Sequence, residues 1–209
     1  METTFDAVVL ANGDFPRHDV PRQVLHDARL LVCCDGAVAR VGRADAVVGD
    51  GDSVPPRFRR LLTRVDEQED NDLTKATRYC ISRLVTAGPP RIAYLGCTGG
   101  REDHTLGNIA LIVRYRRQMG VEPVLFTDTG WFVVGRGRQR FASFPRQQVS
   151  LFNFGCRRIG SEGLRWSAYA YDELWQGTLN EALAGSFTVD ADGLYLVYRT
   201  YEPKENAFL

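Results

Sequence analysis

The stretch RIAYLGCTGGREDHTLGNIALIV, residues 91–113, decides the fold class of this 209-residue chain. Its first five residues form a short apolar run typical of a buried strand, and a glycine-rich loop follows directly. Beyond the loop, apolar residues recur at helical spacing, at Leu106, Ile109, Ala110 and Val113. A strand that passes through such a loop into a helix is the repeating unit of a parallel α/β sheet.

The same alternation extends over the first 128 residues. Further apolar runs lie at 6–11, 30–34, 46–48 and 123–127. Most are apolar throughout, as expected when helices cover both faces of a sheet. Amphipathic stretches at 21–28 and 73–84 supply helices between them. The sequence therefore predicts a Rossmann-like, mostly parallel α/β domain over residues 1–128, with ligands at the carboxyl ends of its strands.

The pattern changes after Gly130. Helical periodicity fades, and short β-like runs are separated by glycine and polar turn residues, at 131–134, 149–154, 164–171, 187–189 and 194–199. Asp192 and Gly193 form a strong hairpin signal. Residues 129–209 are therefore expected to form a C-terminal β-sandwich domain.

Composition narrows the class of protein. Lys+Arg and Asp+Glu both number 26, and a formal net charge of zero does not favour nucleic acid as a partner. The five cysteines contain no C-x-x-C pair, which suits a reducing compartment. No apolar run approaches the roughly 20 residues that a membrane-spanning helix needs. We expect a cytoplasmic protein with no membrane association.

The turn Gly49-Asp50-Gly51-Asp52-Ser53 follows an apolar run and carries two aspartates at i and i+2. On extended backbone, such carboxylates point to one side with their Cα atoms ~7 Å apart. Like charges so close together raise a pKa or require a cation between them, and Mg²⁺ prefers carboxylate and phosphate oxygens. An ordinary acidic turn is the alternative, since Gly and Asp are common turn residues.

Two further segments are ambiguous when taken alone. Asp35, followed by Gly36 and Ala37, could contact a ribose or a metal, or could cap the helix that it precedes. In the polar run 68–75, Asp72 and Lys75 share one helical face near a helix start, where phosphate binds readily. A capping cluster with an exposed ion pair would give the same pattern.

The loop Gly99-Gly100-Arg101-Glu102-Asp103-His104 has a clearer function. Backbone N–H groups of a glycine loop that opens a helix can cradle an anion. Arg101 could clamp a phosphate with two hydrogen bonds. Asp103 could join a metal or a nucleotide, and His104 could face a ligand or pack on the helix.

In order and spacing, these four segments resemble the D-G-(G/A), G-D-x-D-S, Q-D-x-T-D-x-x-K and G-G-R-x-D-H motifs of thiamin pyrophosphokinases. The resemblance implies catalytic roles for Asp50, Asp52, Asp72 and Lys75, with the three aspartates binding Mg²⁺. The ATP-binding residues that it implies are Asp35, Gly36, Gln68, Asn71, Gly99, Gly100, Arg101, Asp103, His104 and Asn108. Glu69 and Asn71 depart from the Asp and Thr usual in the family.

The resemblance continues more thinly into the β half. The segments 163–166 and 177–181 are similar to stretches that lie near thiamin in the family. They imply a domain that binds thiamin and forms a homodimer, with Trp175, Thr178 and Asn180 as thiamin contacts and Trp166 behind them. Leu179 replaces a serine that lies close to thiamin in relatives.

As a whole, the resemblance implies transfer of the pyrophosphoryl group of ATP to the hydroxyl of thiamin, giving thiamin diphosphate and AMP. Two alternatives remain open from the residues. The aspartates could serve a metal-dependent nucleotide phosphohydrolase, or the chain could be a non-catalytic nucleotide-binding module. The second alternative predicts that the metal-binding aspartates are lost, yet Asp50, Asp52 and Asp72 are all present.

Overall fold

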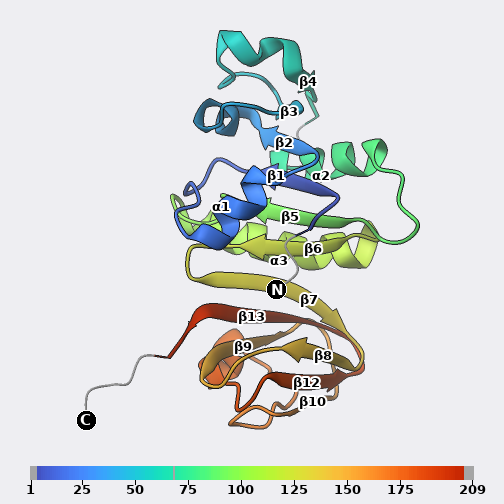
Figure 1. Ribbon diagram of the computed structural model, residues 1–209. Coiled ribbons are helices and arrows are strands. Elements are labelled where there is room, and N and C mark those ends of the chain that lie inside the picture. The colour runs from blue at the N-terminus through green and yellow to red at the C-terminus, as the bar shows by residue number, and fades with distance from the viewer. Residues whose placement is uncertain (1–3, 68, 205–209) are drawn as a thin grey trace. The chain divides into compact units, whose positions relative to one another are not determined.

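The computed structural model describes residues 4–67 and 69–204, which divide after Asp128 into two compact units (Figure 1). The strands of the first unit are β1 (Ala7–Leu10), β2 (Leu31–Cys34), β3 (Ala46–Gly49), β4 (Leu62–Arg64), β5 (Arg91–Leu95) and β6 (Glu122–Phe126). They are parallel and lie in the order β6-β5-β1-β2-β3-β4. The predicted parallel sheet is confirmed. The sequence missed β4, whose three residues are all partly or fully exposed.

Helices cover both faces of this sheet. They are α1 (Asp19–His26), α2 (Asp72–Arg83) and α3 (Glu102–Gln118). Two short 3₁₀ helices, η1 (Asp35–Arg40) and η2 (Pro56–Leu61), follow β2 and β3. Figure 1 shows α1 in front of the sheet and α2 and α3 behind it. Every residue of β1, β2 and β3 is consequently buried, which explains why these strands are apolar throughout. None of the helices in the described residues is long and apolar enough to span a membrane.

The strand order reverses next to β1, and this reversal positions the site. From β1 the chain proceeds outward through β2, β3 and β4, then returns to the other side of β1 as β5 and continues to β6. The connections that follow β1 and β5 therefore run in opposite directions, and a crevice opens at the carboxyl ends of these central strands. Backbone hydrogen bonds join the two loops, from Gly13 N to Gly96 O at 2.7 Å and from Asp14 N to Thr98 O at 2.8 Å.

The second unit contains two antiparallel sheets. One has the order β11-β9-β13-β7, from β7 (Gly130–Arg136), β9 (Gln147–Asn153), β11 (Asn180–Glu181) and β13 (Leu194–Pro203). The other has the order β10-β12-β8, from β8 (Gln139–Ala142), β10 (Ile159–Glu162) and β12 (Ser186–Ala191). Buried residues of both sheets, among them Leu151, Phe187 and Tyr195, form one core. The predicted β-sandwich is confirmed.

One predicted strand, 164–171, is wrong. Apart from an isolated bridge between Leu164 and Ala182, this segment has no strand pairing. Side chains take the N–H groups that a neighbouring strand would need: Asn180 Oδ1 accepts from Trp166 N at 3.2 Å, and Ser161 Oγ accepts from Ala168 N at 2.8 Å. Apolar content alone therefore does not make this segment a strand. The strands β8 and β10 were also not predicted from the sequence, because their many polar residues do not form an apolar run.

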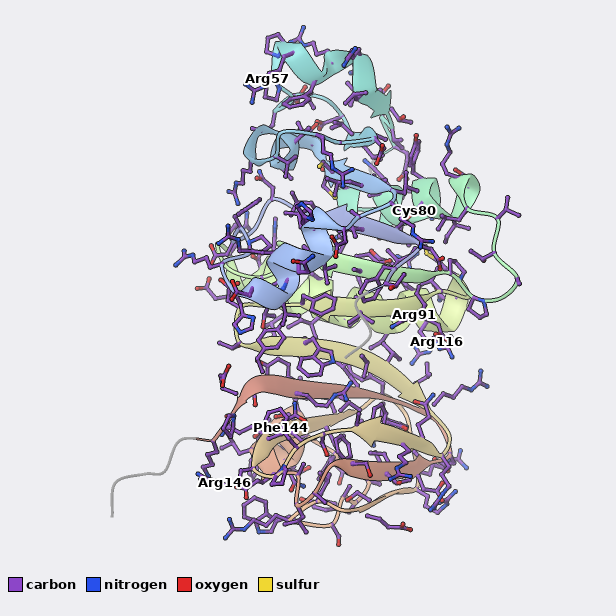
Figure 2. The ribbon with its side chains drawn as sticks, in the orientation of Figure 1. Arg57, Cys80, Arg91, Arg116, Phe144 and Arg146 are labelled. Carbon is purple, nitrogen blue, oxygen red and sulfur yellow. The ribbon has the colours of Figure 1, made fainter. Side chains whose placement is uncertain are left out.

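The five cysteines are unpaired and buried, as expected of small core residues. Figure 2 labels one of them, Cys80 on α2, which is fully buried against the sheet.

Candidate functional site

A cavity of about 430 Å³ lies at the carboxyl ends of β1, β2 and β5, where α2 and α3 begin. Its lining residues are Ala11, Asn12, Gly13, Cys34, Asp35, Gly36, Ser53, Asn71, Asp72, Leu73, Gly96, Cys97, Gly99, Gly100, Arg101, His104 and Asn108. Nine of the residues singled out from the sequence are thus brought together: Asp35, Gly36, Asn71, Asp72, Gly99, Gly100, Arg101, His104 and Asn108. Asp50, Asp52, Lys75 and Asp103 are not in this lining, and Gln68 lies outside the described residues.

The glycines of the loop after β5 are needed for different reasons. Gly96 and Gly100 both have left-handed backbone, with φ of +64° and +73°. A Cβ on Gly96 would overlap the backbone oxygen of Ala11, whereas a Cβ on Gly100 would meet nothing within 4 Å. Gly96 therefore lets the backbone segments after β1 and β5 pack together, and Gly100 leaves open space in the cavity. Gly99 is also left-handed, with φ of +77°, but a Cβ there would meet only the carboxyl group of the exposed Asp14 side chain, which can move aside.

This difference predicts unequal costs of substitution. We expect Gly96→Ala to lower the free energy of unfolding by about 2–5 kcal/mol, from backbone strain and overlap with the backbone oxygen of Ala11 together. Gly100→Ala has only the strain, about 1–2 kcal/mol. Urea unfolding of both variants measures the difference, with Gly88→Ala, at an unstrained and open position, as the control. Equal losses at Gly96 and Gly100 would contradict the packing role of Gly96.

Asp35 does not cap the helix that it begins. Its carboxylate accepts from Gly51 N and from Ser53 N, both at 3.0 Å, and so holds the turn 49–53 against β2. Within that turn, Asp50 Oδ1 accepts from Asp52 N at 3.1 Å. In the part of the chain that the structure describes, no group of three or more His, Cys, Asp or Glu residues is placed to hold a metal ion by itself.

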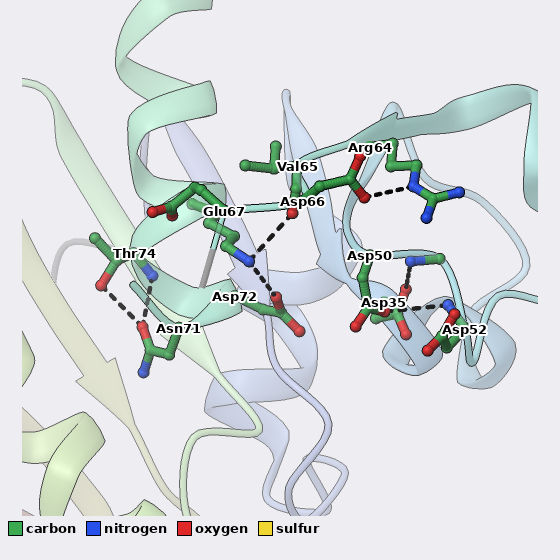
Figure 3. Close-up of polar contacts among 12 residues, drawn as sticks. Asp35, Asp50, Asp52, Arg64, Val65, Asp66, Glu67, Asn71, Asp72 and Thr74 are labelled. Carbon is green, nitrogen blue, oxygen red and sulfur yellow. Dashed lines mark hydrogen bonds and ion pairs between the residues drawn. The ribbon is translucent and has the colours of Figure 1, made fainter. Parts of the chain in front are cut away.

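Asp72 begins α2 (Figure 3), and Lys75 follows in the first turn of the same helix. Lys75 Nζ lies 3.7 Å from Asp72 Oδ1 and donates to Val65 O at 3.2 Å. The lysine side chain is only 4% exposed and that of Asp72 is 41% exposed, so the pair is half-buried and differs from the fully exposed ion pair considered as an alternative. Burial raises the pKa of Asp72, against the opposing effect of Lys75, and the charges of Asp35 and Asp50 raise it further. A cation beside Asp72 would relieve this concentration of negative charge.

Asp70, which was not singled out from the sequence, anchors the acidic run before α2 through ion pairs. Its side chain, 9% exposed, forms ion pairs with Arg78 and, at 2.9 Å, with Arg114. The hydrogen bond from Arg114 lowers the pKa of Asp70, and the charge of Arg78 adds to the effect. The run that precedes Asp72 is thereby tied to both α2 and α3.

At the start of α3, Arg101 forms a fork with Asp103 through Nε at 3.1 Å and Nη2 at 2.5 Å. Both side chains are mostly exposed, and Arg101 supplies no side-chain cap to the helix. Asn108 Nδ2 donates to Cys97 O at 2.8 Å and so anchors the glycine loop to α3. Arg101 thus lines the cavity while paired with Asp103, whereas the amide of Asn108 holds the loop.

Two family models match this chain. Residues 21–122 match the catalytic domain of thiamin pyrophosphokinase, and residues 130–198 match its substrate-binding domain. The chain belongs to the thiamin pyrophosphokinase family. Thiamine pyrophosphokinase 1 of Oryza sativa subsp. japonica is 33% identical over 58% of this chain and 55% of its own length. The chain therefore spans about half the length of this curated relative.

Solved thiamin pyrophosphokinases share the fold. The Bacillus subtilis protein gives a TM-score of 0.74 at 19% identity, covering 93% of this chain and 98% of that one. Yeast thiamin pyrophosphokinase gives 0.73 at 15% identity, covering 93% and 86%. These likenesses confirm an α/β sheet followed by a β-sandwich.

The loop after β1 is a part of this cavity that the sequence analysis did not identify. Asn12 and Gly13 line the cavity, and so does Ser53, which was quoted only as part of the acidic turn. Their position in the sequence could have identified them, because residues that directly follow the central strand of such a sheet reach the crevice.

In the segment matched by the thiamin pyrophosphokinase substrate-binding model, the three proposed thiamin contacts differ in availability. Trp175, in the 3₁₀ helix η3 (Leu174–Gly177), is 69% exposed. Thr178 Oγ1 donates to Trp175 O at 2.6 Å. Asn180 is buried, and its amide is engaged with the backbone of Trp166 and Glu181. Leu179 is 69% exposed, with left-handed φ of +63°, an unusual conformation for leucine.

Proposed function

We propose that this protein is a Mg²⁺-dependent thiamin pyrophosphokinase with ATP and thiamin as substrates. It transfers the pyrophosphoryl group of ATP to the thiamin hydroxyl and releases AMP. The observation that carries the proposal is the cavity at the strand-order reversal, in a chain that matches both domains of the family. Family membership favours neither alternative, the nucleotide phosphohydrolase or the non-catalytic module.

The triphosphate would lie between the starts of α2 and α3. Helix N-termini carry partial positive charge, and Arg101, the N-cap residue of α3, makes no side-chain cap. Asp103 Oδ1 accepts from His104 N at 2.8 Å, so the other N–H groups of the first turn would face the phosphates. Gly100 leaves room for a phosphate to approach the backbone. The guanidinium of Arg101 would exchange part of its fork with Asp103 for phosphate oxygens.

The carboxylates at this site suit Mg²⁺. In nucleotide sites this ion takes one or two carboxylates together with phosphate oxygens and water, and needs no complete protein cage. We propose that Asp72 holds it, with Asp50 and Asp52 on the neighbouring turn. Bound there, Mg²⁺ would neutralise charge on the triphosphate. Asp35 keeps the turn 49–53 in place, and Lys75 holds the carboxylate of Asp72.

Exposed apolar side chains support a thiamin and dimer surface on the second unit. They gather within residues 166–183 and comprise Trp166, Tyr169, Leu174, Trp175, Leu179 and Leu183. An aromatic face such as that of Trp175 suits the cationic thiazolium of thiamin. We propose that a second copy of the chain covers the remainder, giving a homodimer. The cytoplasmic location and the lack of a nucleic-acid partner stay predictions.

The proposal is tested by incubating the protein with ATP, Mg²⁺ and thiamin and separating the nucleotides. We expect AMP to form only when thiamin is present and to disappear when EDTA removes the metal. ADP as the product would indicate an ordinary kinase. Phosphate release without thiamin would favour the hydrolase, and either result would contradict the proposal.

A further inference from the structure

Two buried tyrosines contact α2 from neighbouring elements. The hydroxyl of Tyr115, on α3, lies 2.8 Å from Thr74 Oγ1, and the hydroxyl of Tyr94, on β5, lies 3.1 Å from Thr77 Oγ1. All four residues are fully buried. Buried hydroxyl groups without water must satisfy one another, so the direction of each hydrogen bond can be worked out.

The first of these bonds runs from tyrosine to threonine. Thr74 Oγ1 also lies 2.8 Å from Asn71 Oδ1, an amide oxygen that can only accept. The single hydroxyl hydrogen of Thr74 is therefore given to Asn71, and Tyr115 must donate to Thr74. Burial raises the pKa of Tyr115, which keeps this donor protonated.

This chain of hydrogen bonds fixes the side-chain amide of Asn71. Its Oδ1 accepts a second bond, from Thr74 N at 3.0 Å, so the oxygen faces into α2. The amide nitrogen is then turned to the opposite side (Figure 3). Asn71 lines the cavity, and its Nδ2 has no hydrogen-bond partner within residues 4–67 and 69–204. The free end of the chain of hydrogen bonds is therefore a donor at the cavity.

We infer that Tyr115 is a positioning residue for nucleotide binding. Acting through Thr74, it holds the amide of Asn71 so that Nδ2 donates to a phosphate oxygen of the nucleotide. A donor already held in its binding orientation loses less entropy when the ligand arrives. This inference rests on the proposed function, because it assumes that the cavity binds ATP.

Tyr94 provides a matched control, because its partner Thr77 lies about one turn after Thr74 on α2. Thr77 Oγ1 donates to Leu73 O at 2.7 Å, so Tyr94 in turn donates to Thr77. Loss of this hydroxyl removes the same kind of buried bond. Its chain of hydrogen bonds ends at a backbone carbonyl, however, and not at a side chain that can reach a ligand.

The test compares ATP affinity, measured calorimetrically with Mg²⁺ and without thiamin, and melting temperature in the wild type and three variants. Tyr115→Phe and Tyr94→Phe should lower the melting temperature similarly, but only Tyr115→Phe should weaken ATP binding, by about three- to tenfold. Asn71→Asp keeps the helix cap, since Asp caps as well as Asn. It loses the donor, so ATP should bind about tenfold or more weakly at an unchanged melting temperature.

Unchanged ATP affinity in Tyr115→Phe, or an equal loss in Tyr94→Phe, would overturn the inference while leaving the proposed function intact. A wild-type protein that binds no ATP would instead contradict the proposed function, and the inference with it. If Tyr115→Phe does not fold, Thr74→Val and Thr74→Ser replace it. Serine keeps the chain of hydrogen bonds and valine breaks it, so only valine should weaken ATP binding.

Discussion

Asp72→Asn is expected to reduce kcat about a hundred- to a thousandfold while leaving the fold intact. Asp72 combines three features: it lines the cavity, it begins α2, and its pKa is raised by burial and further by the charges of neighbouring carboxylates. Asparagine keeps the shape of the side chain but removes the charge on which the proposed Mg²⁺ site depends. Steady-state AMP formation and the circular-dichroism melting curve measure the two effects.

Asp19→Asn is the matched control. Asp19 is the first residue of α1, as Asp72 is of α2, so both changes remove a charge that favours a helix N-terminus, worth about 0.3–1 kcal/mol. Asp19 is exposed and not in the cavity lining. Near-normal turnover in Asp72→Asn, or an equal loss in Asp19→Asn, would refute the role assigned to Asp72.

Lys75→Met is expected to lower kcat/KM about a hundredfold and also to lower the free energy of unfolding. Lys75 places a buried ammonium between Asp72 and Val65 O, so its loss frees the carboxylate of Asp72 to move and removes the donor to Val65 O. Removing one partner of a buried ion pair costs about 3–5 kcal/mol, and we expect a smaller loss here because the side chain of Asp72 is 41% exposed. Urea unfolding and ATP-dependent turnover separate the two effects.

Lysine at position 75 is unusual in this chain, which contains only one other, Lys204, among 26 basic residues. A compact ammonium fits where a planar guanidinium would not, so Lys75→Arg should also lose activity. Lys204→Met, at an exposed position, is the control for the same substitution. Full activity in Lys75→Met would show that Asp72 needs no partner.

Sequence periodicity predicted the first unit well for a physical reason. Strands buried on both faces leave uninterrupted apolar runs, so β1, β2, β3, β5 and β6 were found within one or two residues. In the second unit, strands exposed on one face contain polar residues, so a strand such as β8 forms no continuous apolar run and was not predicted. The segment 164–171 was misread because Asn180 and Ser161 take its backbone N–H groups, which no local pattern reveals.

In the candidate site, too, residues with a local sequence pattern could be predicted, whereas contacts between distant residues could not. Gly99, Gly100 and Asp72 could be found from the sequence because each stands next to a predicted strand or helix start. The contacts that support them join distant residues: Asp70 with Arg114, 44 positions apart, and Thr74 with Tyr115, 41 apart. Such contacts depend on how α2 and α3 pack on the sheet. Only the structure shows that Asp35 holds the turn of Asp50 and does not cap its own helix.

Pyrophosphoryl transfer itself is tested most directly with ATP that carries ³²P at the β-phosphorus. If the protein transfers both terminal phosphates as one unit, the label moves to thiamin, and the AMP formed is unlabelled. We predict labelled thiamin diphosphate that appears in proportion to AMP and only with Mg²⁺. Label that stays in ADP, or that is released as free phosphate or pyrophosphate without entering thiamin, would contradict the account.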